Sequence, residues 1–271
     1  MRTKTILQFL ILAASAACSN PPTNTGTDVD AAPPGADAQV PLTPYTNLTV
    51  SLTFDDTFAD QYQVRTMLSQ RGMHATFYVN SSRVGLNAGY MSISQLKDLV
   101  ADGNEIGGHT LNHNHLTQDT PDVAYQEICG DRAGLVNLGF NPTTFAYPFG
   151  DENADIKAMA QSCGYSSART IGGLLDPATC SRCAPGNAMP PADTMLLKTN
   201  GSVKTENTDK TIEDYLVQYS EAGGGWTPIV FHRVCDDCNT NSITVDELGR
   251  LMDWLKAHQV TVKTVSAVMG Q

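Results

Sequence analysis

Two short stretches place carboxylates and imidazoles at the ends of apolar segments. Asp55 and Asp56 follow the apolar run Leu52–Phe54, and about fifty residues later His109 and His113 follow a strand-like segment that ends in a Gly–Gly pair. In a βα architecture the ends of parallel strands meet at one mouth, where such folds carry their chemistry. If a helical turn follows His109, the two imidazoles point the same way.

Asp56, His109 and His113 together predict a catalytic divalent metal site. Two imidazoles and one carboxylate, with an open position for water, form the ligand set of catalytic zinc, and cobalt or another divalent ion also fits. Asp55 is then free to act as general base on that water. Each signal alone has an ordinary alternative, because Asp–Asp at a strand end is often a turn or a helix cap, and two nearby histidines are often both solvated.

The chain resembles the polysaccharide deacetylases with a NodB-homology domain, carbohydrate esterase family four. Their first motif, Thr-Phe-Asp-Asp, is found at residues 53–56, and their second, His-Ser/Thr-x-x-His-x-x-Leu, at residues 109–116. The third, Arg-x-Pro-Tyr-Gly, corresponds to Ala-Tyr-Pro-Phe-Gly at residues 146–150. The last, a hydrophobic strand ending in His, corresponds to residues 229–232. All four motifs occur in the family order.

The resemblance implies an activity and a role for several residues. It implies removal of acetyl groups from an N-acetylated cell-surface or extracellular polysaccharide, with Asp55 as the base. His232 would protonate the leaving amine, and the backbone N–H of Tyr147 would bind the oxyanion. A capped imidazole at a strand end is the ordinary alternative for His232. Trp226 and Tyr147 are also candidates for stacking on sugar rings.

The chain departs from the family pattern at two places. Ala146 stands where the family has an Arg that orients the base, and the Asp–Trp motif that steadies the catalytic His is not evident after Tyr165. Arg169, at the end of the fifth expected strand, is our hypothesis for a replacement charge, and a surface salt bridge is the alternative. We expect His115 to be structural or substrate-facing, because a fourth protein ligand would close the metal site.

The alternation of strand-like and helical patterns predicts an α/β fold with a mostly parallel sheet. The family resemblance refines this expectation to a distorted, incomplete (β/α) barrel of about seven parallel strands. The expected strands are residues 48–54, 75–79, 104–109, 143–147, 165–169, 227–232 and 260–264. The expected helices are residues 58–71, 94–102, 121–138, 154–161, 212–222 and 245–258.

The first 46 residues predict export. Residues 1–17 have the basic start, short apolar run and small residues of a signal peptide, and Cys18 is placed as in a bacterial lipobox. An ordinary signal peptide cut near Ala17 is the alternative. Residues 18–46 predict a lipidated Cys and a disordered linker, followed by the deacetylase domain at residues 47–271. The expected location is the outer membrane or cell surface, by the lipid anchor, or the secreted fraction.

The charge and the cysteines narrow the partners and the compartment. A net charge of −11 argues against nucleic acid or an anionic membrane surface, so the only expected membrane contact is the lipid anchor. The expected partner is an acetylated polysaccharide, and the chain is expected to be a monomer. Removing Cys18 from the seven cysteines leaves six, which favours disulfides in an exported protein. Cys129 and Cys163 are candidates for pairing with each other, and the two C-x-x-C pairs favour disulfides over a four-thiolate zinc site. The connectivity stays open from the sequence.

Three functions remain open from the sequence. The leading one is a metal-dependent deacetylase of an N-acetylated glycan. An O-acetyl esterase of the same fold, acting on a polysaccharide such as xylan, would need the same residues. A non-catalytic glycan-binding lipoprotein is the third, and the departures at Ala146 and after Tyr165 motivate it. All five motif residues are retained, and this argues against a decayed site because a binding module needs no base or acid. They are Asp55, Asp56, His109, His113 and His232.

Overall fold

The computed structural model describes residues 42–176, 179–236 and 238–271. These residues form one compact unit, Leu42–Gln271. The predicted signal peptide, Cys18 and most of the predicted linker lie outside the described residues. Within the described part of the chain, every helix is too short or too polar to span a bilayer.

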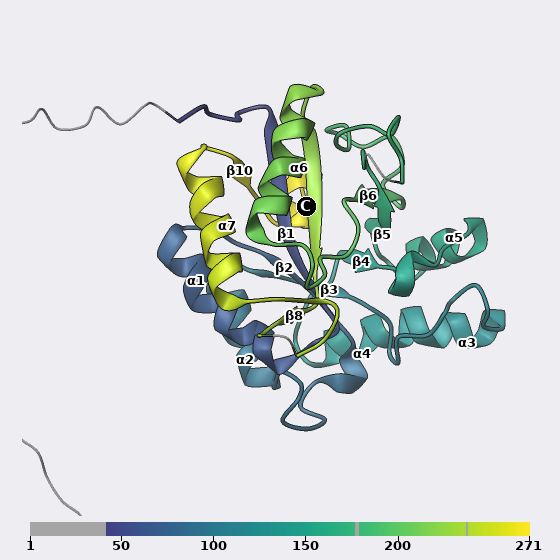
Figure 1. Ribbon diagram of the computed structural model, residues 1–271. Helices are drawn as coiled ribbons and strands as arrows, with labels where there is room; N and C mark the ends of the chain where they lie inside the picture. The colour runs from purple at the N-terminus through teal and green to yellow at the C-terminus, as the bar shows by residue number, and fades with distance from the viewer. Residues whose placement is uncertain (1–41, 177–178, 237) are drawn as a thin grey trace, which may run out of the picture. The chain divides into compact units, whose positions relative to one another are not determined.

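The core of the unit is a parallel sheet curved into a nearly closed barrel (Figure 1). Seven strands follow the order β7, β1, β2, β3, β4, β5 and β6, and the short β10 pairs with the first half of β1. Ser202, after β6, forms a parallel bridge with Val230 of β7 at the seam. The strands are β1 (Leu48–Asp55), β2 (Thr76–Val79), β3 (Glu105–Gly108), β4 (Thr144–Ala146), β5 (Ser167–Gly173), β6 (Leu197–Thr199), β7 (Gly225–Phe231), β8 (Arg233–Val234), β9 (Ser242–Ile243) and β10 (Thr261–Val262).

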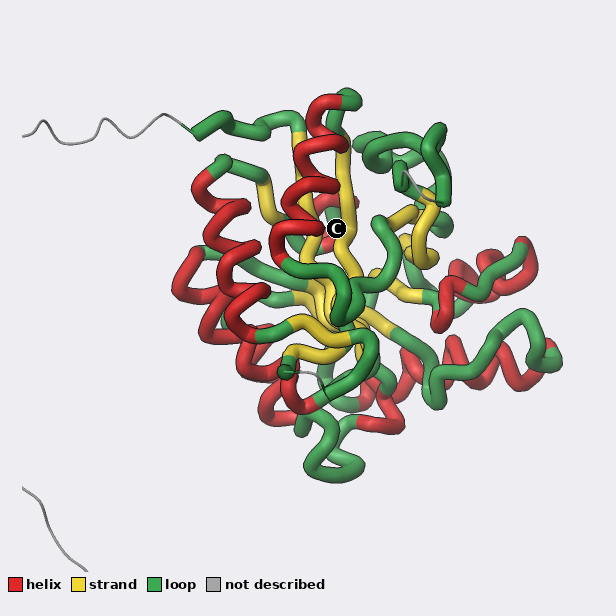
Figure 2. The backbone as a smooth tube through the Cα atoms, in the orientation of Figure 1, coloured by secondary structure: helices red, strands yellow, loops and turns green. Residues whose placement is uncertain are grey.

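The helices lie outside the strands (Figure 2). They are α1 (Val64–Arg71), α2 (Ile93–Ala101), α3 (Pro121–Tyr125), α4 (Asp131–Asn137), α5 (Ala154–Ser162), α6 (Asp209–Glu221), α7 (Val245–Ala257) and α8 (Val265–Met269). Four further helical segments are of the 3-10 or π type, namely η1 (Ala59–Gln63), η2 (Ser81–Arg83), η3 (Gln126–Gly130) and η4 (Pro148–Gly150). The predicted barrel of about seven parallel strands with surrounding helices is therefore confirmed.

Local sequence signals explain where several helices begin. Thr244 and Glu247 form the capping box expected ahead of α7. The start of α2 differs from the prediction, because Ser92 rather than Ser94 caps the helix and forms the box with Gln95. The predicted helix over residues 121–138 is one continuous path interrupted by the π-type turn η3.

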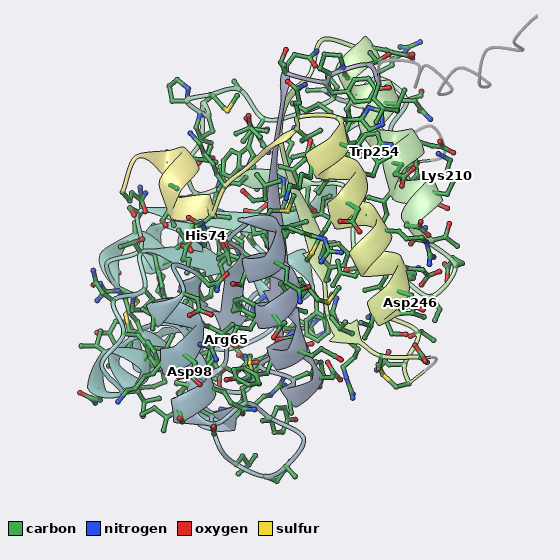
Figure 3. The ribbon with its side chains drawn as sticks, turned by 90° about the vertical axis from the view of Figure 1, so that its left-hand side faces the viewer. Arg65, His74, Asp98, Lys210, Asp246 and Trp254 are labelled. Atoms are coloured by element: carbon green, nitrogen blue, oxygen red, sulfur yellow. A yellow bond between two sulfur atoms is a disulfide. The ribbon has the colours of Figure 1, made fainter. Side chains whose placement is uncertain are left out.

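Buried side chains pack inside the barrel and between its strands and the outer helices. Phe54 stacks between Phe77 and Phe231, with ring centroids 5.1 and 5.2 Å away, under the outer helices. Trp226 lies fully buried, where its indole N–H donates to Ser51 Oγ at 2.9 Å. Figure 3 shows Trp254 on α7, where its ring stacks with Tyr45 at 5.5 Å. The expectation that Trp226 stacks on sugar rings is wrong, because its side chain has no exposed surface.

Two further features complete the comparison with the sequence. Strand β6 was not predicted, since its three residues follow a long loop rich in Pro and Gly. The six cysteines form the bonds Cys129–Cys163, Cys180–Cys183 and Cys235–Cys238. The prediction that these cysteines form disulfides is confirmed, and the structure supplies the pairing that the sequence left open. The four-thiolate alternative falls away because no free thiolate remains among these six.

Candidate metal and catalytic centre

The carboxyl ends of four strands bring the predicted site residues to one end of the barrel. Asp55 is the last residue of β1 and Asp56 follows it, while His109 follows β3. The turn η4 follows β4, and His232 follows β7. Because all these strands are parallel, their carboxyl ends share one rim, which is the position of active sites in βα barrels.

Asp56, His109 and His113 form a cluster that can hold one metal ion. One ligand atom from each residue lies within 4.8 Å of the others. Oδ1 of Asp56 lies 3.3 Å from Nε2 of His113 and 3.8 Å from Nε2 of His109. Two imidazole nitrogens and one carboxylate oxygen are a suitable donor set for zinc, with a position left for a non-protein ligand.

The orientation of His109 supports this fit. Its Nδ1 lies 2.7 Å from the carbonyl oxygen of Ala146, which can only accept, so the ring proton belongs on Nδ1. Nε2 is buried, has no hydrogen-bond partner among the described residues, and presents its lone pair to the cluster. This is the usual arrangement of a metal-binding histidine, in which a carbonyl fixes the tautomer. Burial lowers the pKa of His109 to about 4, so the ring is neutral and able to bind a cation near neutral pH.

The loop between the two histidines differs from the expectation of a helical turn. Thr110 and His113 have φ angles of 67° and 66°, in the left-handed region that a helix excludes. The imidazoles converge because other groups hold the loop. Glu127 of η3 accepts hydrogen bonds from the backbone and side-chain nitrogens of Asn112, at 2.8 and 2.7 Å. The Asn80 side chain donates to the Thr110 carbonyl at 2.9 Å.

Asp55 has one carboxylate oxygen engaged and one free. Oδ1 accepts a hydrogen bond from the Arg169 guanidinium, whereas the buried Oδ2 has no partner among the described residues and lies 3.9 Å from His109 Nε2. Burial raises the pKa of Asp55, but Arg169, with smaller contributions from His109 and His232, outweighs it, so the net shift is downward. Asp55 is therefore an ionised carboxylate with one oxygen directed at the cluster.

Arg169 lies at the level of Ala146 on the neighbouring strand. The two residues are register partners on β5 and β4. Arg169 is fully buried, and its guanidinium lies 4.7 Å from the centre of the Tyr78 ring. The alternative of a surface salt bridge is wrong, since the Asp55–Arg169 pair has almost no exposed surface. Arg169, on the strand next to that of Ala146, thus contacts Asp55. Asp55 is the carboxylate that the Arg of the third motif would contact in the family.

Gln61 connects Asp55, the candidate base, to His232, the candidate acid. Its side-chain amide nitrogen donates to the backbone carbonyls of Asp55 and His232, the second at 2.6 Å. Nδ1 of His232 is buried and has no partner among the described residues, consistent with the missing Asp–Trp motif. No local sequence signal distinguishes Gln61 from a surface residue, because its role depends on contacts across 171 positions.

The proposed role of Tyr147 as oxyanion donor is wrong. Its backbone N–H already donates to the Arg169 carbonyl at 3.0 Å, and its hydroxyl donates to the Met195 carbonyl at 3.1 Å. Its ring is fully buried, so it cannot stack on a sugar either. The third motif indicates a different residue, because the Tyr of Arg-x-Pro-Tyr-Gly aligns with Phe149 and not with Tyr147.

Phe149 lies at the mouth of the cluster. Its φ of 59° turns the backbone sharply, and half of its side chain is exposed. Its ring meets the His113 ring edge-on at 4.5 Å and stacks on His115 at 3.8 Å. His115 is therefore beside the cluster and outside the ligand group, with Nδ1 3.7 Å from Asp151 Oδ2.

Arg83 was not anticipated from the sequence. Its Nη1 lies 3.1 Å from Oδ1 of Asp56, the oxygen that faces both imidazoles. Arg83 belongs to η2, after β2, so a fifth strand contributes to the rim. A cation at this point offsets part of the negative charge of Asp56.

Comparison with known proteins agrees with this geometry. Residues 44–168 match the model of the polysaccharide deacetylase family. Over 119 residues the chain is 34% identical to a chitin deacetylase of Pestalotiopsis sp, covering 43% of this chain and 39% of that protein. Over 122 residues it is 32% identical to the peptidoglycan-N-acetylglucosamine deacetylase PgdA of Listeria monocytogenes (strain EGD / Mackaness), covering 44% of this chain and 24% of that protein. The chain thus spans less than half the length of either relative.

The fold is also shared with a solved structure. The peptidoglycan deacetylase PdaC from Bacillus subtilis superposes with a TM-score of 0.56 at 20% sequence identity, covering 84% of this chain and 93% of that chain. The resemblance inferred from the four motifs is confirmed by the family match and by this shared architecture.

Proposed function

We propose that the chain, whose residues 44–168 match the polysaccharide deacetylase family, is a metal-dependent hydrolase removing acetyl groups from an N-acetylated cell-surface or extracellular polysaccharide. One observation carries the proposal: Asp55, charge-paired on one oxygen and free on the other, lies beside the converging Asp56, His109 and His113. A module that only binds glycan needs neither a buried base nor a set of metal ligands.

The cofactor we propose is one divalent ion, zinc or alternatively cobalt, held by Asp56, His109 and His113. The chemistry that such an ion supplies is polarisation of the acetyl carbonyl and acidification of water. The residues fit this group because Nε2 of His109 is buried without a partner, and because His109 is neutral.

Asp55 would accept the proton of the attacking water through its free Oδ2. Its lowered pKa keeps it ionised, and Arg169 fixes Oδ1 so that Oδ2 stays directed at the cluster. The oxyanion that forms on the acetyl carbon needs a hydrogen-bond donor. We assign this role to the backbone N–H of Phe149, which stands at the Tyr position of the family motif beside His113.

His232 would donate a proton to the departing amine nitrogen. An amide nitrogen leaves poorly unless it is protonated, whereas an ester alkoxide leaves more readily. Gln61 holds the His232 backbone in a fixed relation to Asp55, so base and acid lie on the same rigid frame. The same residues would also serve an O-acetyl esterase acting on a polysaccharide such as xylan.

Acetate release from a panel of acetylated polysaccharides tests the proposal. We expect release from an N-acetylated polymer by the wild-type protein, loss of release with a chelator, and recovery with zinc or cobalt. Asp55→Asn should retain the metal and lose about 10²–10⁴ of the rate. Asp246→Asn, at an exposed position at the start of α7, is the matched control. Equal, chelator-insensitive rates for wild type and Asp55→Asn, with glycan binding retained, would favour the binding-lipoprotein alternative.

We also propose that the protein acts outside the cytoplasm, tethered through a lipid on Cys18. The basis is the sequence of residues 1–18 and the three disulfides, which persist in oxidising compartments. Mass spectrometry of the N-terminus should find a lipidated Cys18 in membrane fractions. In the Cys18→Ala variant, the protein should either be released from the membrane or remain unprocessed. An unmodified N-terminus at or beyond Cys18 would reject the anchor.

A further inference from the structure

The short strand β8, which follows His232, pairs along one edge with β9. The backbone N–H groups of Arg233 and Cys235 donate to the carbonyls of Asn241 and Ile243, at 3.0 and 2.9 Å. In the described part of the chain, the sheet that contains β8 has two strands, so the other edge of β8 needs different partners for its polar groups.

Side chains of η1 take the place of a strand at this second edge. The backbone N–H of Val234 donates to Oδ1 of Asp60 at 3.1 Å, and the Val234 carbonyl accepts from the Gln63 side chain at 2.7 Å. Gln61 donates to the His232 carbonyl at 2.6 Å. Val234 is fully buried, so water cannot readily replace the partners of its backbone.

Asp60 contacts this segment with both of its carboxylate oxygens. Oδ1 accepts from the Val234 N–H, whereas Oδ2 accepts a hydrogen bond from Nε of Arg233. The guanidinium of Arg233 also lies 4.5 Å from the centre of the Phe58 ring, just before η1. Because ionised groups form stronger hydrogen bonds than neutral ones, Asp60 provides the strongest of the contacts between η1 and β8.

The His232 ring depends on this main-chain frame for its position. Its buried Nδ1 has no hydrogen-bond partner among the described residues, and the Asp–Trp motif that would steady the ring is not evident after Tyr165. The place of the ring is therefore set by the backbone that carries it. A displacement of about 1 Å in a reacting group can cost about 10²-fold in rate.

We propose that Asp60 is a positioning residue for His232, acting through Arg233 and the backbone N–H of Val234. The inference rests on the proposed deacetylase function, in which the imidazole gives a proton to the sugar nitrogen as the bond from that nitrogen to the acetyl carbon breaks. Asp60 exchanges no proton in this step. It fixes where the ring stands relative to Asp55 across the rim.

Rates on an amide and on an activated ester test this role. The hexamer of N-acetylglucosamine needs an acid because an unprotonated amine leaves poorly, whereas 4-nitrophenyl acetate releases a stable phenolate without one. Asp60→Ala should lower kcat for the hexamer about 10–100-fold at a nearly constant KM. It should leave the chelator-sensitive rate on the ester within about twofold of the wild-type rate, because that reaction needs no acid.

Two further variants sharpen the test. Asp60→Asn keeps an acceptor for the Val234 N–H and loses the charge facing Arg233, so it should lose less activity on the hexamer than Asp60→Ala. Asp209→Ala is the matched control, because Asp209 forms an ion pair with Arg250 on the outer helices and is about as buried as Asp60, with 14% and 16% of the two side chains exposed. It should retain both rates.

Other outcomes would contradict this role in different ways. Equal losses on the amide and the ester in Asp60→Ala would leave Asp60 a purely structural residue, and unchanged rates on both would remove it from the reaction. If the wild-type protein releases acetate from no N-acetylated polymer, the proposed function fails instead, and NMR then tests the positioning directly. The ring signals of His232, assigned with a His232→Gln variant, should broaden or shift in Asp60→Ala and remain unchanged in Asp209→Ala. Identical His232 signals in wild type and Asp60→Ala would refute the proposal.

Discussion

The Arg169 guanidinium donates a hydrogen bond to Oδ1 of Asp55, although 114 positions separate the two residues in the chain. Both side chains are almost fully buried, and Arg169 lies on the strand next to that of Ala146, the position of the family Arg. The cation that contacts Asp55 therefore comes from β5 in this chain, and not from the Ala146 position on β4.

Arg169→Met should move the acid limb of the pH–rate profile to higher pH. Asp55 must be ionised to accept a proton, and burial without the cation would raise its pKa, so activity should require a higher pH, by about one to three units. Arg169→Lys should recover part of the shift, and Arg65→Met, which breaks an outer ion pair with Asp102, is the control. An unshifted acid limb would contradict the role given to Arg169. Figure 3 shows the control residue Arg65 on α1.

Gln61→Leu should lower kcat with little change in KM. The variant removes both hydrogen bonds that tie the Asp55 and His232 carbonyls together, and a small displacement of reacting groups can cost about 10²-fold in rate. Loss of partners for two buried carbonyls should also cost about 1–3 kcal/mol of unfolding free energy for each. Steady-state kinetics and urea unfolding measure the two effects, with the exposed Gln70→Leu as control. Lower stability at an unchanged kcat would leave Gln61 a structural role only.

His113→Ala should abolish stoichiometric metal binding, whereas His115→Ala should retain it. Two remaining protein ligands rarely hold a catalytic ion, and His115 lies outside the ligand group. Elemental analysis after dialysis against zinc gives the metal content of each variant. Equal loss in both variants would place His115 among the ligands, and full retention in His113→Ala would remove His113 from them.

Asp131 should make the stability of the metal-free protein depend on pH. Burial raises its pKa from 3.8 to about 7, so between these values the folded state binds a proton that the unfolded state has released. The stabilisation from Asp131 is complete below about pH 4 and is lost as the pH rises to about 7. Relative to Asp131→Asn, the wild-type unfolding free energy should fall by about 1.4 kcal/mol for each pH unit in this window.

Urea unfolding in the presence of a chelator, at several pH values from 5 to 8 as about the accessible range, measures that difference. Subtracting the Asp131→Asn curve removes the contributions of the other titrating groups that both proteins share. A flat or rising difference would show that Asp131 is ionised in the folded protein at all these pH values.

The sequence is sufficient to predict the residues of the candidate site that belong to short motifs. Asp55, Asp56, His109 and His113 were named from two motifs, and the structure brings them to one rim because consecutive parallel strands end together. Most strands were found within one or two residues, since buried apolar runs define them. The helix at α2 began earlier than expected because two serines were equally good caps on sequence alone.

The remaining features depend on contacts between distant segments. The backbone between His109 and His113 is held by Asn80 and Glu127, so its left-handed residues could not be read from local pattern. Tyr147 is excluded as oxyanion donor only by the pairing of distant strands, because its backbone N–H donates to the Arg169 carbonyl of β5. Gln61 belongs to none of the motifs. Its amide can bond the carbonyls of Asp55 and His232 only because β1 and β7 lie side by side.

The burial of Trp226 gives the barrel a built-in optical reporter. The chain has two tryptophans, and the indole of Trp226 is sealed from water and bonded to Ser51, whereas Trp254 is only partly covered on α7. The fluorescence of Trp226 should lie at shorter wavelengths than that of Trp254 and move to the red when β7 separates from β1. Emission in a Trp254→Phe variant would then follow the opening of the strands that carry Asp55 and His232, without any added label.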